Sequence, residues 1–194
     1  MTAIDYTQRP SLTYQELLDT DSHEVPDVLR WFSPMPPSEA DVPVERYTSA
    51  EFHQLEVDKL WTKVWQMACR EEDIPEVGDH LSYDVVGRSI LVVRTQVDEI
   101  KAYHNVCPHR GRRLKESPGR DTELRCAFHG FAWELNGCLK QVPCQWDFPR
   151  LEPDEWSLPE VKVGTWGGFV FINMDPDCDT LEAHLGDLTR HFDR

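Results

Sequence analysis

The chain has 194 residues, and its 20 Lys and Arg against 35 Asp and Glu give a formal net charge of −15. Apolar residues make up 40%, as in ordinary globular proteins, so the chain can bury a core. The acidic balance argues against nucleic acid and anionic membranes as partners. No apolar run is long enough for a membrane span and no signal-peptide layout is present. We therefore expect a cytoplasmic protein with reduced thiols, in which six Cys indicate a metal or catalytic role.

The first part of the chain predicts an arm followed by a helix. Residues 1–46 are rich in Pro and acids, which favours an extended arm with a helical turn at Tyr14–Leu18. This arm wraps a neighbouring subunit or, as the alternative, is a disordered tail. Thr48 and Glu51 then have the spacing of a capping box, and apolar residues recur at helical intervals as far as Trp65.

From Asp73 onward the pattern has the period of β-strands. Strands are predicted at 80–86, 89–94, 100–105, 131–135, 138–142 and 168–174. Asn136-Gly137 is a strong hairpin signal between two of them. A final helix is predicted over 180–192. The middle of the chain is therefore expected to be a small antiparallel β domain with helical material on both sides.

Two loops between these strands carry the residues suited to chemistry. They read CPHRG from residue 107 and CAFHG from residue 126. Together they form a C-x-H motif and a C-x-x-H motif separated by sixteen residues. The candidate ligands are Cys107, His109, Cys126 and His129. Two thiolates and two imidazoles suit zinc or an iron–sulfur cluster. Zinc modules usually pair like ligands on one ion, whereas one Cys and one His on each loop can be divided between two irons, the cysteines on one and the histidines on the other.

These loops resemble the cluster-binding loops of Rieske proteins. From about Tyr47 to Leu188, the chain resembles the N-terminal half of the alpha subunit of ring-hydroxylating Rieske non-haem iron oxygenases. Four stretches carry this resemblance: WTKVWQMACREEDIPEVGDHLSYDVVGRSILVVR, IKAYHNVCPHRGRRL, CAFHGFAWELNGCLKQVP and LPEVKVGTWGGFVFINMDP. The resemblance implies a mainly β fold, an antiparallel Rieske [2Fe–2S] β-sandwich flanked by an N-terminal helix and by a strand–helix segment of a truncated α+β catalytic domain. The implied segments are the arm at 1–46, helical scaffold at 47–74, the Rieske domain at 75–165 and the start of the catalytic domain at 166–194.

Three positions separate the chain from the Rieske proteins of cytochrome bc-type complexes. Those proteins have an additional cysteine in each loop and a serine after the second His-Gly, where this chain has Arg112, Phe128 and Phe131. No loop disulfide is expected. Because fewer hydroxyls donate to the sulfurs, we expect a potential nearer about −150 mV than +300 mV. The oxygenase family usually has Tyr at Phe128 and Trp at Phe131, so aromatic cover is kept and one hydroxyl is lost.

The resemblance also implies a function. The chain would accept electrons from a ferredoxin or flavin reductase and pass them to a mononuclear Fe(II) held only in the full-length parent, which forms a homotrimer or an alpha3beta3 assembly. The family's D-x-x-H-x-x-x-x-H motif for that iron is absent, and no catalytic residue is assigned. His184 and His191 are interpreted as solvent-facing positions on one helix face, and His23, His53, His80 and His104 in the same way. We expect a fragment, or a truncated or split gene product.

Several alternatives stay open from the sequence. Six basic residues around the loops form a candidate docking island for an acidic ferredoxin, unless they pair internally. They are Arg110, Arg112, Arg113, Lys115, Arg120 and Arg125. The whole chain could instead be a stand-alone Rieske-type ferredoxin or a zinc module, and the parent's substrate could be a steroid, carboxylate or amine in place of an arene. Four further cysteines are interpreted as packing or surface thiols: Cys69, Cys138, Cys144 and Cys178.

Overall fold

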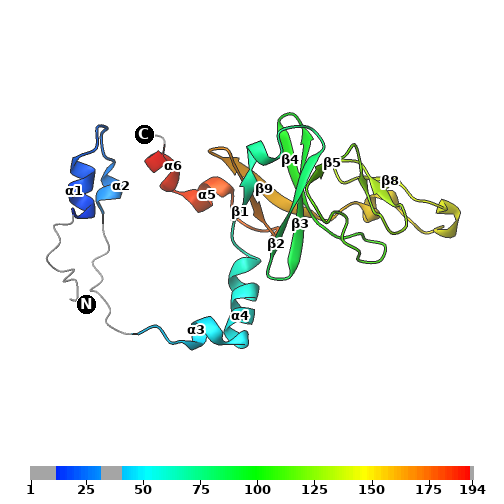
Figure 1. Ribbon diagram of the computed structural model, residues 1–194, viewed down its shortest axis with the longest axis horizontal. Helices are drawn as coiled ribbons and strands as arrows, with labels where there is room; N and C mark the ends of the chain where they lie inside the picture. Colours follow the sequence, from blue (N-terminus) through cyan, green and yellow to red (C-terminus); the bar gives the residue numbers. More distant parts are fainter. Residues whose placement is uncertain (1–11, 32–40, 193–194) are drawn as a thin grey trace, which may run out of the picture. The chain divides into compact units, whose positions relative to one another are not determined.

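The computed structural model describes residues 12–31 and 41–192. Its contacts divide the chain into two compact units, one of Met1–Asp41 with Leu185–Arg194 and one of Val42–His184. Every strand of the described residues belongs to the second unit (Figure 1). The segment boundaries predicted from the sequence stay predictions.

The strands form two antiparallel sheets. The larger sheet has the order β1-β10-β9-β4-β3-β2-β5 and the smaller has the order β6-β7-β8. The bounds are β1 Gln66–Arg70, β2 Asp79–Val85, β3 Arg88–Gln96, β4 Glu99–His104, β5 Gly119–Arg120, β6 Leu124–Arg125, β7 Ala132–Trp133, β8 Leu139–Gln141, β9 Glu160–Trp166 and β10 Phe169–Asn173. Figure 1 shows the smaller sheet, marked by β8, at one end of the larger one. The predicted mainly antiparallel β fold is confirmed.

Strand β3 organises the core because both of its faces are buried. Side chains alternate between the faces of a strand, so Leu91 and Val93 point to one side while Ile90 and Val92 point to the other. The loop core lies on the first side and comprises Leu91, Val93, Tyr103, Cys107, Leu114, Leu124, Cys126, Phe131, Trp133 and Leu158. The sheet core lies on the second side and comprises Cys69, Ile74, Ile90, Val92, Ala102, Val161, Val170 and Ile172. The run Ile90–Val93 is apolar without interruption for this reason.

The N-terminal helices differ in detail from the sequence prediction. The elements are α1 Tyr14–Asp19, α2 Asp27–Arg30, α3 Glu45–Thr48, α4 Ala50–Glu56 and the π-helix η2 Val57–Trp61. The helical turn predicted at Tyr14 is confirmed, with Thr13 and Glu16 forming its capping box. The predicted cap at Thr48 is wrong, because Thr48 ends α3 and the Ser49 side chain accepts from the Phe52 N–H to begin α4. Part of the predicted arm, residues 1–11 and 32–40, lies outside the described residues.

The predicted C-terminal helix is two helices. They are α5 Leu181–Leu185 and α6 Leu188–Phe192, and Gly186 between them has a left-handed φ of +52°. His184 and His191 therefore lie on different helices, and their predicted common helix face is wrong. Short 3-10 helices complete the elements: η3 Glu71–Asp73, η4 Gln145–Asp147 and η5 Pro153–Trp156. Across the described ranges, no helix has the length and apolar character needed to cross a membrane.

The hairpin turn at Asn136-Gly137 packs directly on the main sheet. The Tyr103 hydroxyl, from the buried side chain of β4, donates to the Leu135 carbonyl at 2.9 Å. Gly137 has φ +88°, and a Cβ placed there would lie 2.6 Å from Tyr103 Cε1. Gly137 is therefore required both for its backbone conformation and for its lack of a side chain.

We expect Gly137→Ala to lower the free energy of unfolding by about 2–4 kcal/mol, since it adds overpacking to left-handed strain. Gly87→Ala is the matched control, because Gly87 also has positive φ (+75°) but open space around the added carbon. That variant should lose only about 1–2 kcal/mol. Urea unfolding of both variants measures the difference, and equal losses would contradict the packing argument.

Candidate metal centre

The two predicted loops share one backbone arrangement. In the first, the Cys107 N–H donates to the Arg112 carbonyl at 2.7 Å and the Gly111 N–H donates to the Cys107 carbonyl at 2.8 Å. In the second loop, Cys126 donates to Phe131 at 2.8 Å and Gly130 donates to Cys126 at 3.0 Å. Both closing glycines, Gly111 and Gly130, have positive φ, +71° and +77°, a conformation that glycine adopts without strain. Each loop is therefore the same tight turn with its cysteine at the start.

The two cysteines lie together inside the loop core. Each side chain is 2% exposed, and the two thiols are within hydrogen-bonding contact. Burial raises the pKa of the Cys107 thiol, while the backbone N–H groups of His109 and Arg110, which donate to its sulfur, act in the opposite direction. A buried thiol pair with N–H donors aimed at it fits a metal that displaces the thiol protons.

The two histidines form a second pair nearer the surface. Their ring centroids lie 4.8 Å apart, with His109 half-buried and His129 exposed. Burial, followed by the neighbouring His129 and Arg110, lowers the pKa of His109. The neutral imidazole that this favours is the form that binds metal ions. One loop thus contributes a buried sulfur and an outer nitrogen, and the other loop does the same.

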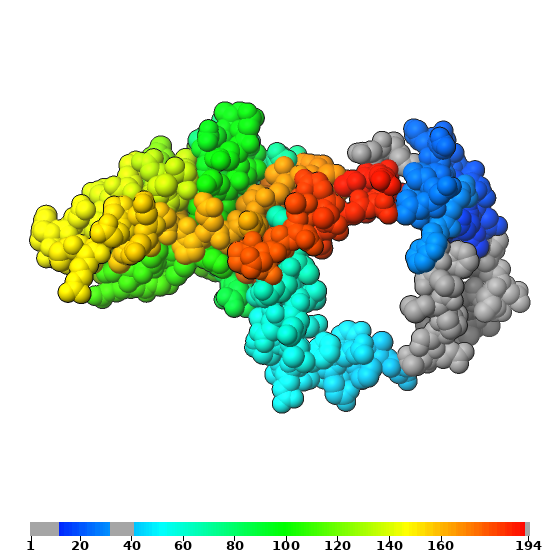
Figure 2. Space-filling view, turned by 180° about the vertical axis from the view of Figure 1, so that it is seen from behind, coloured from blue at the N-terminus to red at the C-terminus, as the bar shows by residue number. Residues whose placement is uncertain are grey.

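Aromatic side chains surround the histidine pair. Phe131 stacks on His109 at a ring-centroid distance of 4.7 Å, Phe128 covers His129 at 3.8 Å, and Phe148 makes a T-shaped contact with His109 at 5.8 Å. Phe148 comes from the segment between β8 and η5, which forms one end of this unit (yellow in Figure 2). Trp146 on the same segment is 79% exposed. Phe148 was not predicted at this site, because no local pattern in the sequence places a residue this far along the chain beside the first loop.

The basic island is mostly paired within the chain. Five of its six cations have a carboxylate partner at 2.6–2.9 Å. The pairs are Arg112–Glu116, Arg113–Asp84, Lys115–Asp121, Arg120–Asp79 and Arg125–Glu123. Arg110 is exposed, and no ion pair among the described residues includes it. The alternative given by the sequence, in which these basic residues pair within the chain, therefore holds for most of the island.

The remaining cysteines and histidines do not join the centre. Cys69 is buried, and burial raises its thiol pKa to about 12, while Cys138 and Cys144 are exposed and Cys178 is half-buried. All six cysteines are free thiols. His80 is only 3% exposed, so its predicted solvent-facing position is wrong. In the part of the chain that the structure describes, no three His, Cys, Asp or Glu side chains converge as ligands of a single ion, and the four candidate donors form two pairs instead.

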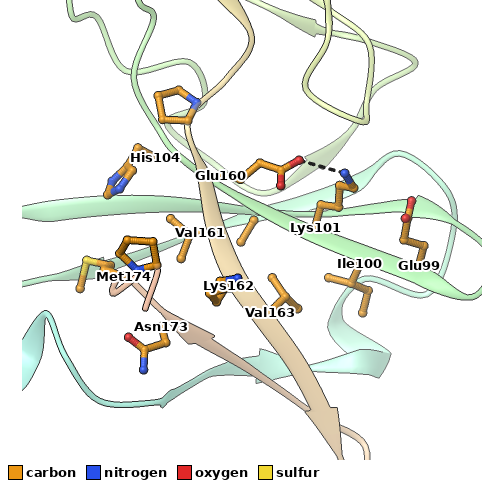
Figure 3. A pocket seen from close by; sticks show the side chains of 13 residues that line it. Glu99, Ile100, Lys101, His104, Glu160, Val161, Lys162, Val163, Asn173 and Met174 are labelled. Atoms are coloured by element: carbon orange, nitrogen blue, oxygen red, sulfur yellow. Dashed lines mark hydrogen bonds and ion pairs between the residues drawn. The ribbon is translucent and has the colours of Figure 1, made fainter. Parts of the chain in front are cut away.

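A separate groove of about 600 Å³ lies where β4 and β9 diverge (Figure 3). These strands pair only at Ala102–Val161 and Tyr103–Glu160, so the edges beyond them are apart. Lys101 and Glu160 form an ion pair of 2.9 Å across the groove. None of the four candidate ligands lines it, so the groove is distinct from the metal centre.

Comparison with protein families gives a matching domain that spans both loops. Residues 64–152 match the Rieske [2Fe–2S] domain. The alpha subunit of biphenyl 2,3-dioxygenase from Rhodococcus jostii is 30% identical over 149 residues, covering 76% of this chain and 32% of the relative. The oxygenase subunit of carnitine monooxygenase from Escherichia coli K12 is 30% identical over 154 residues, covering 78% of this chain and 41% of the relative. The chain thus spans less than half the length of these relatives.

Solved structures give the same result. Naphthalene 1,2-dioxygenase from Rhodococcus sp. superposes with a TM-score of 0.73 at 29% identity, covering 78% of this chain and 36% of that structure. An apo quaternary ammonium Rieske monooxygenase superposes with a TM-score of 0.75 at 26% identity, covering 79% and 45%. These matches extend beyond the Rieske domain into its flanks, which does not favour a stand-alone ferredoxin. The chain therefore carries a Rieske [2Fe–2S] domain, and its relatives are alpha subunits of Rieske non-haem iron oxygenases, of which it matches less than half the length.

Proposed function

We propose that this chain is the electron-transfer part of a Rieske oxygenase alpha subunit. It would take single electrons from a ferredoxin or flavin reductase and pass them to the mononuclear iron of the oxygenase. No residue of this chain is proposed as a ligand of that iron. The observation that carries the proposal is the donor arrangement, in which two matching loops bring two buried thiols together and two imidazoles together. When bound, a [2Fe–2S] cluster supplies a one-electron redox centre at this place.

The chain's own residues would bind the cluster from two sides, one buried and one near the surface. Cys107 and Cys126 would hold one iron within the loop core, where burial excludes water from the sulfurs. His109 and His129 would hold the other iron on the outer side, where the exposed His129 ring offers a short path for an electron. Phe128 and Phe131 limit water around the imidazoles, and the His109 and Arg110 N–H groups would stabilise charge on the Cys107 sulfur.

The proposed partners and compartment follow from this arrangement. A cytoplasmic location suits a centre that needs two reduced thiols. Arg110 is adjacent to a proposed ligand and keeps its charge unpaired among the described residues, so an acidic donor would meet it near the exposed imidazole. Assembly of the full-length parent as a homotrimer or an alpha3beta3 complex is part of the same proposal, supported by the chain's similarity to oxygenase alpha subunits.

Cys107→Ser should abolish cluster binding, because serine lacks the soft sulfur ligand that iron–sulfur clusters use. The purified variant should lose its visible absorbance, its iron and the low-g electron resonance signal of the reduced protein. Cys69→Ser is the matched control, since Cys69 is also buried but belongs to the sheet core. A Cys107→Ser protein that kept the complete signal would overturn the ligand assignment.

The midpoint potential should lie near about −150 mV, at the low end of the Rieske range. Phe128 and Phe131 carry no hydroxyl that could donate to a sulfur, so the reduced state gains less stabilisation than it would from such donors. Redox titration followed by electron resonance measures this value. A midpoint near +300 mV would be incompatible with the proposed electronic environment.

Arg110→Glu should slow reduction by an acidic ferredoxin severalfold at low salt, and the difference should shrink at high salt as the charges are screened. Lys59→Glu is the matched control. Lys59 is exposed on η2, away from the loops, and its reversal changes the net charge by the same amount. Stopped-flow reduction rates compare the two variants, and equal slowing would assign the effect to net charge and not to docking.

A further inference from the structure

A buried amide side chain stands at the base of the first loop. Asn105 lies two residues before Cys107 in the sequence and is 4% exposed. Its backbone N–H donates to the Ser89 carbonyl at 2.9 Å, which fixes it to the start of β3. Unlike the proposed ligands, Asn105 has no place in the cluster chemistry described so far.

The side chain of Asn105 joins the two ends of the loop. Its Oδ1 accepts from the backbone N–H groups of Leu114 at 3.1 Å and of Lys115 at 3.0 Å. Its Nδ2 lies 2.7 Å from the Lys115 carbonyl and 3.1 Å from the hydroxyls of Ser82 and Ser89. One side chain therefore holds the returning end of the loop against its starting end and against β2 and β3. All the hydrogen-bonding capacity of the amide is used in doing so.

The loop closed in this way presents the N–H groups that face the first sulfur. The backbone N–H groups of His109 and Arg110 act to lower the pKa of the Cys107 thiol, and both residues lie between the two ends that Asn105 joins. Hydrogen bonds to cluster sulfurs raise the potential of an iron–sulfur centre by stabilising the added electron. The second loop is held differently, by the exposed Arg125 side chain, whose guanidinium donates to the Gly130 carbonyl at 2.8 Å.

We propose that Asn105 is a positioning residue for the cluster, which sets the direction of the N–H donors on Cys107 and thereby tunes the potential and retention of the centre. The inference rests on the proposed function, since it requires the chain to hold a [2Fe–2S] cluster. Asn105 acts through the backbone and touches no ligand atom of the centre.

The test compares Asn105→Ala with Asn173→Ala in the full chain. Asn173 is also a buried amide, 1% exposed, which donates to the Lys63 carbonyl and accepts from the Asp175 N–H, but it lies on β10 in the larger sheet. Asn105→Ala should shift the midpoint potential to a more negative value and change the g-values of the reduced centre. It should also release iron to a chelator roughly tenfold faster, because two buried backbone donors lose their partner. Asn173→Ala should lose thermal stability and keep the wild-type potential.

A second variant keeps the inference testable if Asn105→Ala does not fold. Ser82→Ala combined with Ser89→Ala removes the side-chain acceptors of Nδ2 and leaves the Oδ1 contacts, so a smaller shift of the same sign is expected. A potential and g-values equal to those of Asn173→Ala, in whichever Asn105 or serine variant folds, would overturn the positioning role. A wild-type chain that binds no iron–sulfur cluster would instead overturn the proposed function, so the two failures are distinguishable.

Discussion

The burial of two thiols against each other is the constraint on which the rest of this structure depends. Cys107 and Cys126 belong to the loop core, so each loop that delivers a cysteine must satisfy its own backbone polar groups where water is excluded. The matching hydrogen bonds from the cysteine to the residue five positions on, and from the closing glycine back to the cysteine, meet that requirement. Each tight turn has only one or two residues between its cysteine and its histidine. The imidazole therefore lies on the outer side of the loop.

The larger sheet packs against the two cysteine loops on one face and against the sheet core on the other. β3 serves both, with Leu91 beneath the loops and Ile90 on the opposite face. Fully burying such side chains contributes about 1.5–3 kcal/mol each, so both faces of β3 stabilise the fold. Tyr103 performs a similar task on β4, since its ring closes the loop core and its hydroxyl secures the hairpin at Leu135.

The sequence was sufficient wherever the signal is local. The hairpin at Gly137 depends on such a short run of residues. The four proposed ligands also lie in short runs, and the structure brings their two loops together, but their role as ligands stays a prediction. Strand β9 was missed although Val161 and Val163 alternate with polar residues, because the preceding prolines and acids resemble a loop. The burial of His80 and the position of Phe148 beside His109 depend on tertiary packing between distant segments, which periodicity does not report.

The two loops are secured by side chains of opposite character, and this gives the outer histidines different surroundings. Asn105 is neutral and buried, so its hydrogen bonds are insensitive to salt, and the loop that carries His109 is fixed to β2 and β3. Arg125 is charged and exposed, and it shares its guanidinium between Glu123, Gly130 and Gln141, which are contacts that salt screens. The exposed His129 thus lies on the loop whose anchor responds to the ionic surroundings. In the proposed function, an electron entering or leaving at that imidazole would meet the more adaptable of the two loops, while the two cysteines stay in a fixed, buried environment.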